Sequence, residues 1–350
     1  MENQLINKIL ENYLKKIPDI DYFVVANTLK PNNDCSLAHA STDELFSRTE
    51  FAEIASAIFD DFGFVNVFYS EQEFIKYIIN NNLSREIFVF NYARNGNKEG
   101  KKSLIPAFCD LYKIKYSGSN AFVISLLRNK FVCGNLLSKF GIPIPESCIF
   151  ESGRTYIGDV NALTGKKVIA KNICESASMD LSDENIFIFN EKIEHVLVGL
   201  INKINRDKIL LQRFIDGKEC EVLVLRDGNE FHAMQPVEII LNGRNFIDTQ
   251  TSNSYNYRFC NLEESFDANT VNKIKGYAEY SAKILNIKDY ARFDFRIDQH
   301  NNMYLIDIAG TPYTIKHSSI TYLFTSIYNY DYKEIYKCLA GLSYHNYLAE

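Results

Sequence analysis

Short apolar runs alternate with segments of helical periodicity throughout the first third of the chain. The strand-like runs are residues 21–27, 65–69, 86–92 and 114–116, and the helical segments are residues 49–62, 71–80 and 105–112. Strands joined by helices in this way pair in parallel, because each helix returns the chain to the end of the sheet at which the previous strand began. The pattern therefore predicts a parallel sheet with helices on both faces.

The rest of the chain is richer in strands that follow one another closely. A helix is predicted over residues 121–140, because Gly141 and two nearby prolines can end it. Further helices are predicted over 191–205 and 271–285, and strands over 166–171, 209–214, 221–225, 231–240, 291–297 and 303–308. The three strands between 209 and 240 predict an antiparallel meander. The polar segment 242–257 is predicted to be a flexible loop that closes over a cleft.

Composition narrows the class of protein. The 350 residues suggest two or three structural units, and a hydrophobic content of 46% supplies a sizeable core. Lys plus Arg is 38 and Asp plus Glu is 44, and the resulting formal charge of −6 disfavours binding to nucleic acid. No apolar run reaches the ~18–20 residues of a membrane span. Residues 1–16 read as a polar amphipathic helix rather than a signal peptide, so we expect a cytoplasmic protein.

The eight cysteines are scattered along the chain and contain no Cys-x-x-Cys pair. This spacing disfavours a zinc cluster, and a chain of this length does not need disulfides to hold its core together. We therefore expect reduced thiols.

The strand over residues 291–297 carries the sharpest chemical pattern. Phe293, Phe295 and Ile297 alternate with Arg292, Asp294 and Arg296, so the two sets face opposite sides of the sheet. Asp307 lies on the next strand between two isoleucines. Paired strands would place both aspartates beside Arg292, where Mg²⁺ carrying a nucleotide phosphate would relieve their repulsion. The alternative is a solvated sheet face with ordinary ion pairs.

Two weaker signals accompany this strand. Lys171 ends an apolar strand and precedes a small polar loop, from which it could reach a phosphate. An exposed lysine at a strand end is the commoner case. His317 and Ser318 are adjacent without an obvious acidic partner, so Ser–His–Asp chemistry is not favoured.

Taken in order, these signals resemble the ATP-grasp superfamily, in its D-alanine–D-alanine ligase-like branch, from about Phe90 to Ser318. The resemblance rests on Tyr-Ser-Gly-Ser at 116–119, Lys130, Gly-Ile-Pro-Ile-Pro at 141–145, the segment 209–225, and the strands that carry Asp294 and Asp307. It implies an ATP-grasp fold of class α/β and α+β with a Rossmann-like parallel-sheet domain at the N-terminus. The implied domains are residues 1–119 on the substrate side, 120–211 as the central ATP-grasp subdomain, and 212–350 as the C-terminal subdomain with metal and acceptor sites.

The resemblance also implies a role for each matching residue. Lys130 and Lys171 would contact ATP phosphates, Glu175 and Ser178 would lie in the loop that covers them, and Gln212, Arg213, Phe214 and Ile215 would form the adenine hinge. Glu219 would bind the ribose, Asp294 and Asp307 would bind Mg²⁺, and Arg292 would stabilise an oxyanion. Glu50 is the nearest candidate for holding the amino group of the first substrate, and His317 and Ser318 would lie near the second substrate.

Several positions depart from the family pattern. Asp307 and Ala309 stand where the family has a metal-binding Glu and Asn, and Ser252 falls near a loop lysine of the family. Ser176 and Asp180 replace loop glycines, and Tyr313 replaces a glycine after Pro312. Ala309 has no ligand atom, and Ser252 removes one positive charge from the phosphate site. These changes put D-alanyl-D-alanine synthesis itself in doubt.

The resulting hypothesis is an ATP-dependent carboxylate–amine ligase that works through an acyl phosphate. Its cofactors would be ATP and Mg²⁺, and its partners would be small-molecule carboxylate and amine substrates, with a homodimer plausible from the family. The main alternative is a catalytically weak or inactive ATP-grasp-like protein that binds a nucleotide or an amino acid. A third possibility is a kinase that releases the acyl phosphate.

Overall fold

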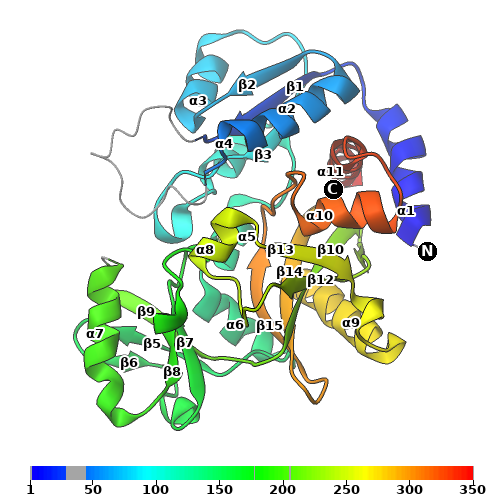
Figure 1. Ribbon diagram of the computed structural model, residues 1–350. Coiled ribbons are helices and arrows are strands. Elements are labelled where there is room, and N and C mark those ends of the chain that lie inside the picture. The colour runs from blue at the N-terminus through cyan, green and yellow to red at the C-terminus, as the bar shows by residue number, and fades with distance from the viewer. Residues whose placement is uncertain (1, 29–44, 177, 205, 350) are drawn as a thin grey trace.

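The computed structural model describes residues 2–28, 45–176, 178–204 and 206–349, and it is built around three β-sheets (Figure 1). The first sheet has four strands in the order β2-β1-β3-β4, and its pairings are all parallel. Its strands are β1 (Asp21–Ala26), β2 (Val65–Phe68), β3 (Ile87–Tyr92) and β4 (Lys115–Tyr116). The parallel sheet predicted for the first third is therefore confirmed.

Three helices connect these strands and pack on the sheet: α2 (Arg48–Phe62), α3 (Glu71–Asn80) and α4 (Leu104–Tyr112). Ser47 caps α2 and Ser70 caps α3, each through a hydroxyl that accepts a backbone N–H bond. All six residues of β3 are buried, as expected for a strand covered on both faces.

The helix predicted over 121–140 is two helices, α5 (Ala121–Arg128) and α6 (Lys130–Ser138). Asn129, between them, leaves the helical region with φ −90° and ψ 90°. Its side chain accepts a hydrogen bond from the N–H of Val132, so Asn129 is the N-cap of the second helix. The prediction of one helix was wrong because this cap competes locally with helix continuation.

The second sheet has five strands in the order β6-β5-β9-β7-β8, and its pairings are antiparallel. Its strands are β5 (Ser147–Glu151), β6 (Tyr156–Ile157), β7 (Lys167–Lys171), β8 (Ile186–Ile188) and β9 (Lys208–Arg213). Helix α7 (Glu194–Lys203) packs its apolar face on this sheet in a core of its own.

The third sheet has the order β13-β12-β10-β14-β15, with β11 paired to β10. Its strands are β10 (Lys218–Asp227), β11 (Glu230–Ala233), β12 (Val237–Leu241), β13 (Tyr257–Asn261), β14 (Tyr290–Ile297) and β15 (Met303–Ala309). Helix α9 (Ala268–Ile284) joins the core on one face. The predicted meander is corrected here, because β9 belongs to the second sheet and the run 231–240 is split into two strands.

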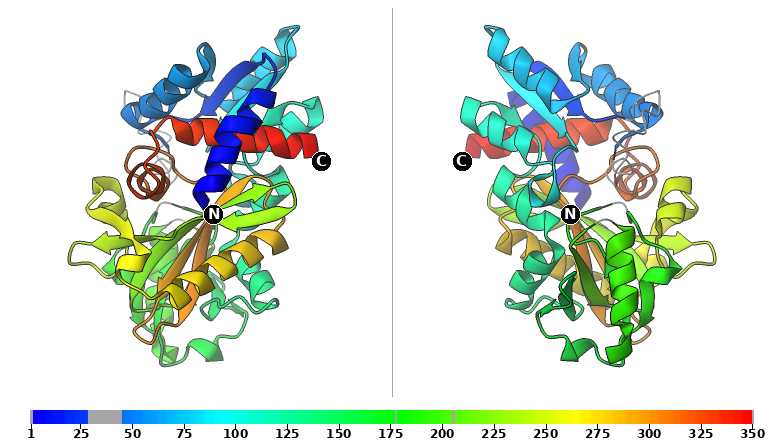
Figure 2. Two further views of the ribbon diagram at one scale, coloured as in Figure 1. Left: turned by 90° about the vertical axis from the view of Figure 1, so that its right-hand side faces the viewer. Right: turned by 90° about the vertical axis from the view of Figure 1, so that its left-hand side faces the viewer.

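The two ends of the chain meet beside the first sheet. Residues of α1 (Glu2–Lys8) and α11 (Glu334–Ala349) share one hydrophobic core with β1 and β3. Helix α11 contacts both α2 and β10, so it joins the N-terminal sheet to the third sheet (Figure 2). This core therefore combines residues from the N-terminal and C-terminal parts of the chain and does not belong to one continuous segment.

In the part of the chain that the structure describes, no helix is both long and apolar enough to cross a membrane. The seven described cysteines are free thiols in buried positions, and Cys35 lies outside the described residues.

Candidate functional site

One cleft of about 2480 Å³ is lined by residues from all three sheets. This volume exceeds the ~300–1,000 Å³ typical of a site for one small ligand, so the cleft has room for more than one. All of the predicted site residues lie along its wall: Glu50, Lys130, Lys171, Glu175, Ser178, Gln212, Arg213, Phe214, Ile215, Glu219, Arg292, Asp294, Asp307, His317 and Ser318. The tertiary structure thus brings them together, and their individual roles remain predictions.

The third sheet presents a row of acidic side chains to this cleft. Asp294 pairs across the strands with Asp307 on one side and with Glu221 on the other. Sequence reasoning missed Glu221, although it alternates with the buried Cys220 and Val222 and so faces the same side as Glu219. The apolar residues of β14 point to the opposite, buried face, as predicted.

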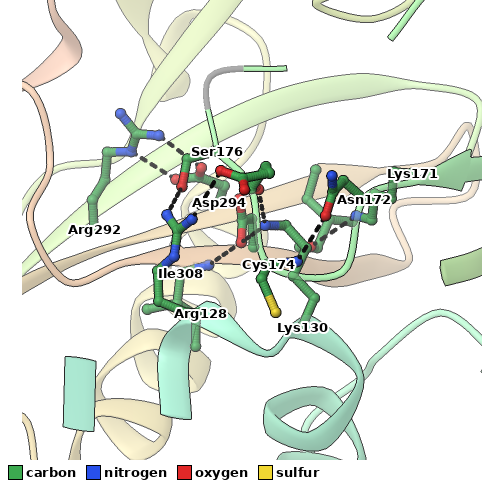
Figure 3. Close-up of polar contacts among 12 residues, drawn as sticks. Arg128, Lys130, Lys171, Asn172, Cys174, Ser176, Arg292, Asp294 and Ile308 are labelled. Carbon is green, nitrogen blue, oxygen red and sulfur yellow. Dashed lines mark hydrogen bonds and ion pairs between the residues drawn. The ribbon is translucent and has the colours of Figure 1, made fainter. Parts of the chain in front are cut away.

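Arg292 stands between two of these carboxylates. Its Nε and Nη2 atoms donate to both oxygens of Asp294 at 2.8 Å, and Nη2 also lies 2.9 Å from Glu221 (Figure 3). Burial raises the pKa of Asp294; Arg292 opposes this effect and the like charge of Glu221 adds to it. A divalent cation would compensate the acidic row more fully than one guanidinium does.

Two lysines approach the end of this row. The Nζ atom of Lys130 lies 3.4 Å from Asp307 and donates to the carbonyl of Glu175 at 2.6 Å (Figure 3). The Nζ atom of Lys171 donates to the carbonyl of Ile306 at 3.3 Å. Ile306 is the extra residue of an irregularity in the pairing of β14 with β15, and this irregularity turns its carbonyl toward the lysine. Burial lowers the pKa of Lys171 to about 8.

The helix break at Asn129 sets the position of Lys130. Since Lys130 is the first residue of α6, its backbone N–H is not needed inside the helix, and it bonds the carbonyl of Ile173 at 3.3 Å. The start of α6 is thereby fixed against the loop that follows β7. A continuous helix would not leave this N–H available.

Asp294 and Asp307 fit a magnesium site that a ligand completes. Among the described residues, no three His, Cys, Asp or Glu side chains form a metal site by themselves. The two aspartates would supply two oxygen ligands, and phosphate oxygens would have to supply others. Ala309 pairs across from Arg292, and its methyl side chain has no atom that could coordinate a metal.

The predicted adenine hinge lies where β9 ends. The N–H of Phe214 bonds the carbonyl of Lys167, and Gln212 is buried. Arg213 forms an ion pair with Glu146 at 3.0 Å. The carbonyl of Ile215 accepts from Arg296 at 2.7 Å.

The structure gives Arg296 a part that sequence reasoning missed. It pairs with Glu219 at 2.8 Å and donates to the carbonyls of Gly217 and Asn245. Burial raises the pKa of Glu219, and Arg296 opposes this effect. A ribose at Glu219 would therefore meet a carboxylate that Arg296 already holds in place.

Glu175 does not face the cleft with a free carboxylate. One oxygen lies 2.9 Å from Lys101 and 3.2 Å from Arg128, and the other lies 3.1 Å from Arg206. Lys101, Arg128 and Glu175 are buried. Glu175 contacts Lys130 through its backbone carbonyl instead, which accepts a hydrogen bond from the lysine Nζ atom.

The segment 242–257 is not a plain loop, because it contains the short helix α8 (Thr249–Ser254). Asp248 caps this helix by accepting from the N–H of Thr251, a signal that the prediction overlooked. The hydroxyl of Thr249 donates to the carbonyl of Ser178 at 2.7 Å. The helix is thereby joined to the loop that the resemblance places over the phosphates.

Two of the remaining predicted residues, Glu50 and Ser318, take part in helix caps. Glu50 completes the cap of α2 by accepting from the N–H of Ser47, and its other oxygen accepts from the hydroxyl of Tyr255. Ser318 caps α10 (Ser319–Tyr322) through the N–H of Thr321.

His317 belongs to an aromatic wall. The rings of Tyr255, Tyr257 and Phe259 surround the imidazole, with centroids 4.7–5.3 Å away. Burial lowers the pKa of His317, so this wall is uncharged near neutral pH.

Comparisons with known proteins show which family the chain resembles. Residues 191–337 match the family described as the C-terminus of D-ala D-ala ligases. The chain is 22% identical over 236 residues to the D-alanine–D-alanine ligase of Carboxydothermus hydrogenoformans, covering 66% of this chain and 73% of that protein. It is 22% identical to the uncharacterized protein y4sG of Sinorhizobium fredii, covering 66% and 67% of the two chains. It spans 57% of the D-alanine–D-alanine ligase of Acetivibrio thermocellus, at 25% identity over 61% of its own length.

Solved structures extend the likeness to almost the whole chain. The D-alanine–D-alanine ligase of Bacillus anthracis complexed with ATP superposes with a TM-score of 0.67 at 12% identity, over 93% of this chain and 97% of that one. The VanG D-Ala:D-Ser ligase of Enterococcus faecalis gives 0.65 at 13% identity, over 93% and 100%. At such identities the superpositions establish the fold.

Proposed function

Since the chain is a D-alanine–D-alanine ligase-like protein of the ATP-grasp superfamily, we propose that it is an ATP-dependent ligase that joins a carboxylate to an amine through an acyl phosphate. The observation that carries this proposal is the convergence of Lys130, Lys171, Asp294 and Asp307 on one cleft. Phosphoryl transfer depends mainly on positioning and charge neutralisation, and these side chains supply both.

In the first half of the reaction, Lys130 and Lys171 hold the phosphates of ATP. Gln212 to Ile215 contact the adenine and Glu219 accepts hydrogen bonds from the ribose. Asp294 and Asp307 would hold Mg²⁺, which would neutralise phosphate charge. The carboxylate oxygen of the first substrate then attacks the γ-phosphorus, and ADP leaves.

In the second half, an amine attacks the acyl carbon and phosphate is expelled. Arg292 stabilises the oxyanion of the tetrahedral intermediate, an effect typically worth ~3 kcal/mol. Both of its contacts to Asp294 use oxygens that a metal would need. With Asp294 as a metal ligand, Arg292 would give up these contacts, and its guanidinium would be available to the reacting centre.

The remaining residues border the substrates. Glu50 lies at the start of α2 and contacts Tyr255, which follows α8, so the two segments meet across the cleft. Ser178 ties α8 to the phosphate loop. We assign Glu50 to the amino group of the first substrate, and His317 and Ser318 to the second substrate.

The test is incubation of the protein with Mg-ATP and pairs of amino acids, followed by measurement of ADP and by mass spectrometry. We expect ADP together with a product whose mass equals the two substrates minus one water. Asp294→Asn should abolish both signals, whereas Asp60→Asn, at an exposed position on α2, should not. ADP formation that needs no amine would instead identify a kinase.

The second candidate is a protein that binds nucleotide without turnover. Ala309 favours it, because the position across from Arg292 contributes no metal ligand. Calorimetric binding of ATP with no ADP formed across the whole amino-acid panel would establish this candidate and exclude the ligase.

A further inference from the structure

One buried arginine of the cleft has no assigned role. Arg94 lies just beyond the end of β3, lines the cleft, and is 2% exposed. Its backbone is held firmly: the side-chain oxygen of Asn27 accepts from the N–H of Arg94, and Glu71 accepts from the N–H of Asn95 at 3.0 Å. Asn27 follows β1, so Arg94 lies where the carboxyl ends of two neighbouring parallel strands meet. That edge is the usual ligand side of a parallel sheet.

Two aromatic rings pack against the Arg94 guanidinium from neighbouring directions, because the two ring centroids are themselves only 5.4 Å apart. The ring centroids of Phe46 and Tyr313 lie 4.4 and 4.3 Å from its central carbon. The edge of the planar group carries five N–H donors for hydrogen bonding. Among the described residues the side chain makes one contact, a long bond of 3.4 Å from Nη2 to the carbonyl of Thr311, and Nε has no partner there.

The other buried arginines of the cleft have acidic partners. Arg128 has Glu175, and Arg296 has Glu219. Arg292, which is only partly buried, has Asp294 and Glu221. For Arg94, no carboxylate is within ion-pair distance among residues 2–28, 45–176, 178–204 and 206–349. An arginine cannot release its proton, and a buried charge without an anion is costly. The edge of Arg94 therefore has the properties of an anion-binding site.

The position of this edge relative to the reacting face defines what it would bind. Thr311, which Arg94 reaches, is two residues beyond Ala309, and Ala309 pairs across from Arg292. Two residues of extended chain span at most about 7 Å. Arg94 is thus close to the face that carries Arg292 and Asp294 without belonging to it. A ligand that fills both places has one carboxylate to react and a second anionic group to bind.

We infer that Arg94 binds a second carboxylate of a substrate, so that this protein acts on a dicarboxylic amino acid rather than on a small neutral one. The inference rests on the proposed function for the identity of the other carboxylate. In this inference Arg94 helps to select the substrate, in addition to packing against the two aromatic rings. A merely structural arginine would join Phe46 to Tyr313 without any preference among ligands.

Calorimetry in the presence of a non-hydrolysable ATP analogue and Mg²⁺ tests this inference. The probes are glutamate and aspartate, in both enantiomers, against glutamine and asparagine, which have the same shape without the second charge. We expect at least one acid to bind about 10-fold or more tightly than its amide. Phosphoserine and inorganic phosphate form a second arm, and tighter binding of these than of the dicarboxylates would overturn the carboxylate assignment.

The variant Arg94→Gln should weaken binding of the acid about 100-fold and leave the affinity for the ATP analogue within about twofold. Arg94→Lys should restore only part of the loss, because a lysine cannot present a planar pair of donors. Arg154→Gln, at an exposed arginine outside the cleft, is the matched control and should change neither affinity. Loss of nucleotide affinity in Arg94→Gln would overturn the inference, because Arg94 would then serve the phosphates.

If Arg94→Gln does not fold, the test is the affinity of the wild-type protein for the acids compared with its affinity for their amides. Equal binding of acids and amides, or no binding of either, overturns the inference. Turnover with neutral amino acids alone also overturns it and leaves the ligase function intact. A preference for acids without any turnover leaves the carboxylate-binding role of Arg94 standing and removes the ligase function.

Discussion

The cleft is bordered by two ion clusters with opposite central charges, of which the first is the more deeply buried. In the first, which we call the Glu175 cluster, one carboxylate lies at the centre and contacts Lys101, Arg128 and Arg206. In the second, the Arg292 cluster, one guanidinium lies among Glu221, Asp294 and Asp307. Figure 3 shows the side chains of Arg128 and Arg292 approaching the same region from different elements.

The way in which the charges are paired indicates a structural role for the Glu175 cluster and a role in the reaction for the Arg292 cluster. Both oxygens of Glu175 are held by cations from segments far apart in sequence, so this cluster fixes the loop after β7 in place. In the Arg292 cluster the carboxylates outnumber the arginine, and Asp307 is left to a longer contact with Lys130. That cluster can accept a further cation, whereas the Glu175 cluster cannot.

Removing a carboxylate from the Arg292 cluster should have the largest effect on activity. We expect Asp294→Asn to lower ligase turnover about 1000-fold, or ~4 kcal/mol, because a metal ligand is lost. Folding should persist, since Arg292 keeps Glu221 as its partner. ADP release at saturating Mg-ATP and thermal melting measure the two quantities. Turnover within tenfold of wild type would mean that this cluster does not serve the reaction.

The same change in the Glu175 cluster should act on stability instead. Glu175→Gln leaves buried cations without their central carboxylate, which typically costs ~3–5 kcal/mol. Urea denaturation should show a lower midpoint. Glu184→Gln, which breaks the exposed pair with Lys203, is the control and should leave the midpoint unchanged. If the urea midpoint is the same for both variants, the Glu175 cluster does not stabilise the fold as its burial indicates.

Lys130 sharpens the comparison because it touches both clusters, through the carbonyl of Glu175 and the carboxylate of Asp307. We expect Lys130→Gln to weaken ATP binding by about 10- to 100-fold, since charge-assisted hydrogen bonds contribute about 1.5–3 kcal/mol. Its effect on the urea midpoint should be smaller than that of Glu175→Gln. Unchanged ATP affinity by calorimetry would assign Lys130 to the structural cluster alone.

The smallest expected effect lies outside both clusters, at His317. Burial lowers its pKa below the usual 6.5, so the unfolded chain binds more protons than the native protein as pH falls through that value. Stability should therefore decrease with acidification below about pH 6.5. His345 shifts in the same direction, so the measurement is the difference between wild type and His317→Asn in urea midpoints at pH 7 and 5.5. Identical pH dependence in the two proteins would contradict this reading.

Much of the fold was readable from local pattern. The alternation of Phe293, Phe295 and Ile297 with charged residues placed β14 and oriented its faces correctly. The strand and helix runs of the first third predicted a parallel sheet, and the structure has one. Hydrophobic periodicity records which side of an element is buried, and it does so without reference to the rest of the chain.

Errors arose where a local cap or a distant partner decided the outcome. Asn129 divides one periodic helix into two because its side chain competes for a backbone N–H. The strand β9 was grouped with β10 because they are adjacent in sequence, yet β9 pairs with β5 and β7. Turn signals show where strands end, but they do not tell which strands become neighbours.

The candidate site likewise combines residues that the sequence predicted with contacts that only the structure shows. The pattern of the strands selected Asp294, Asp307 and Lys171, and the family resemblance added Lys130; all four line the cleft. No sequence signal assigned Lys101, Arg128 and Arg206 to the carboxylate of Glu175, or left Arg94 between Phe46 and Tyr313. Amino-acid order fixed which charges the chain carries and which face of each strand they occupy. Only tertiary folding decided which of them are paired, because the cost of a buried charge depends on neighbours contributed by distant segments.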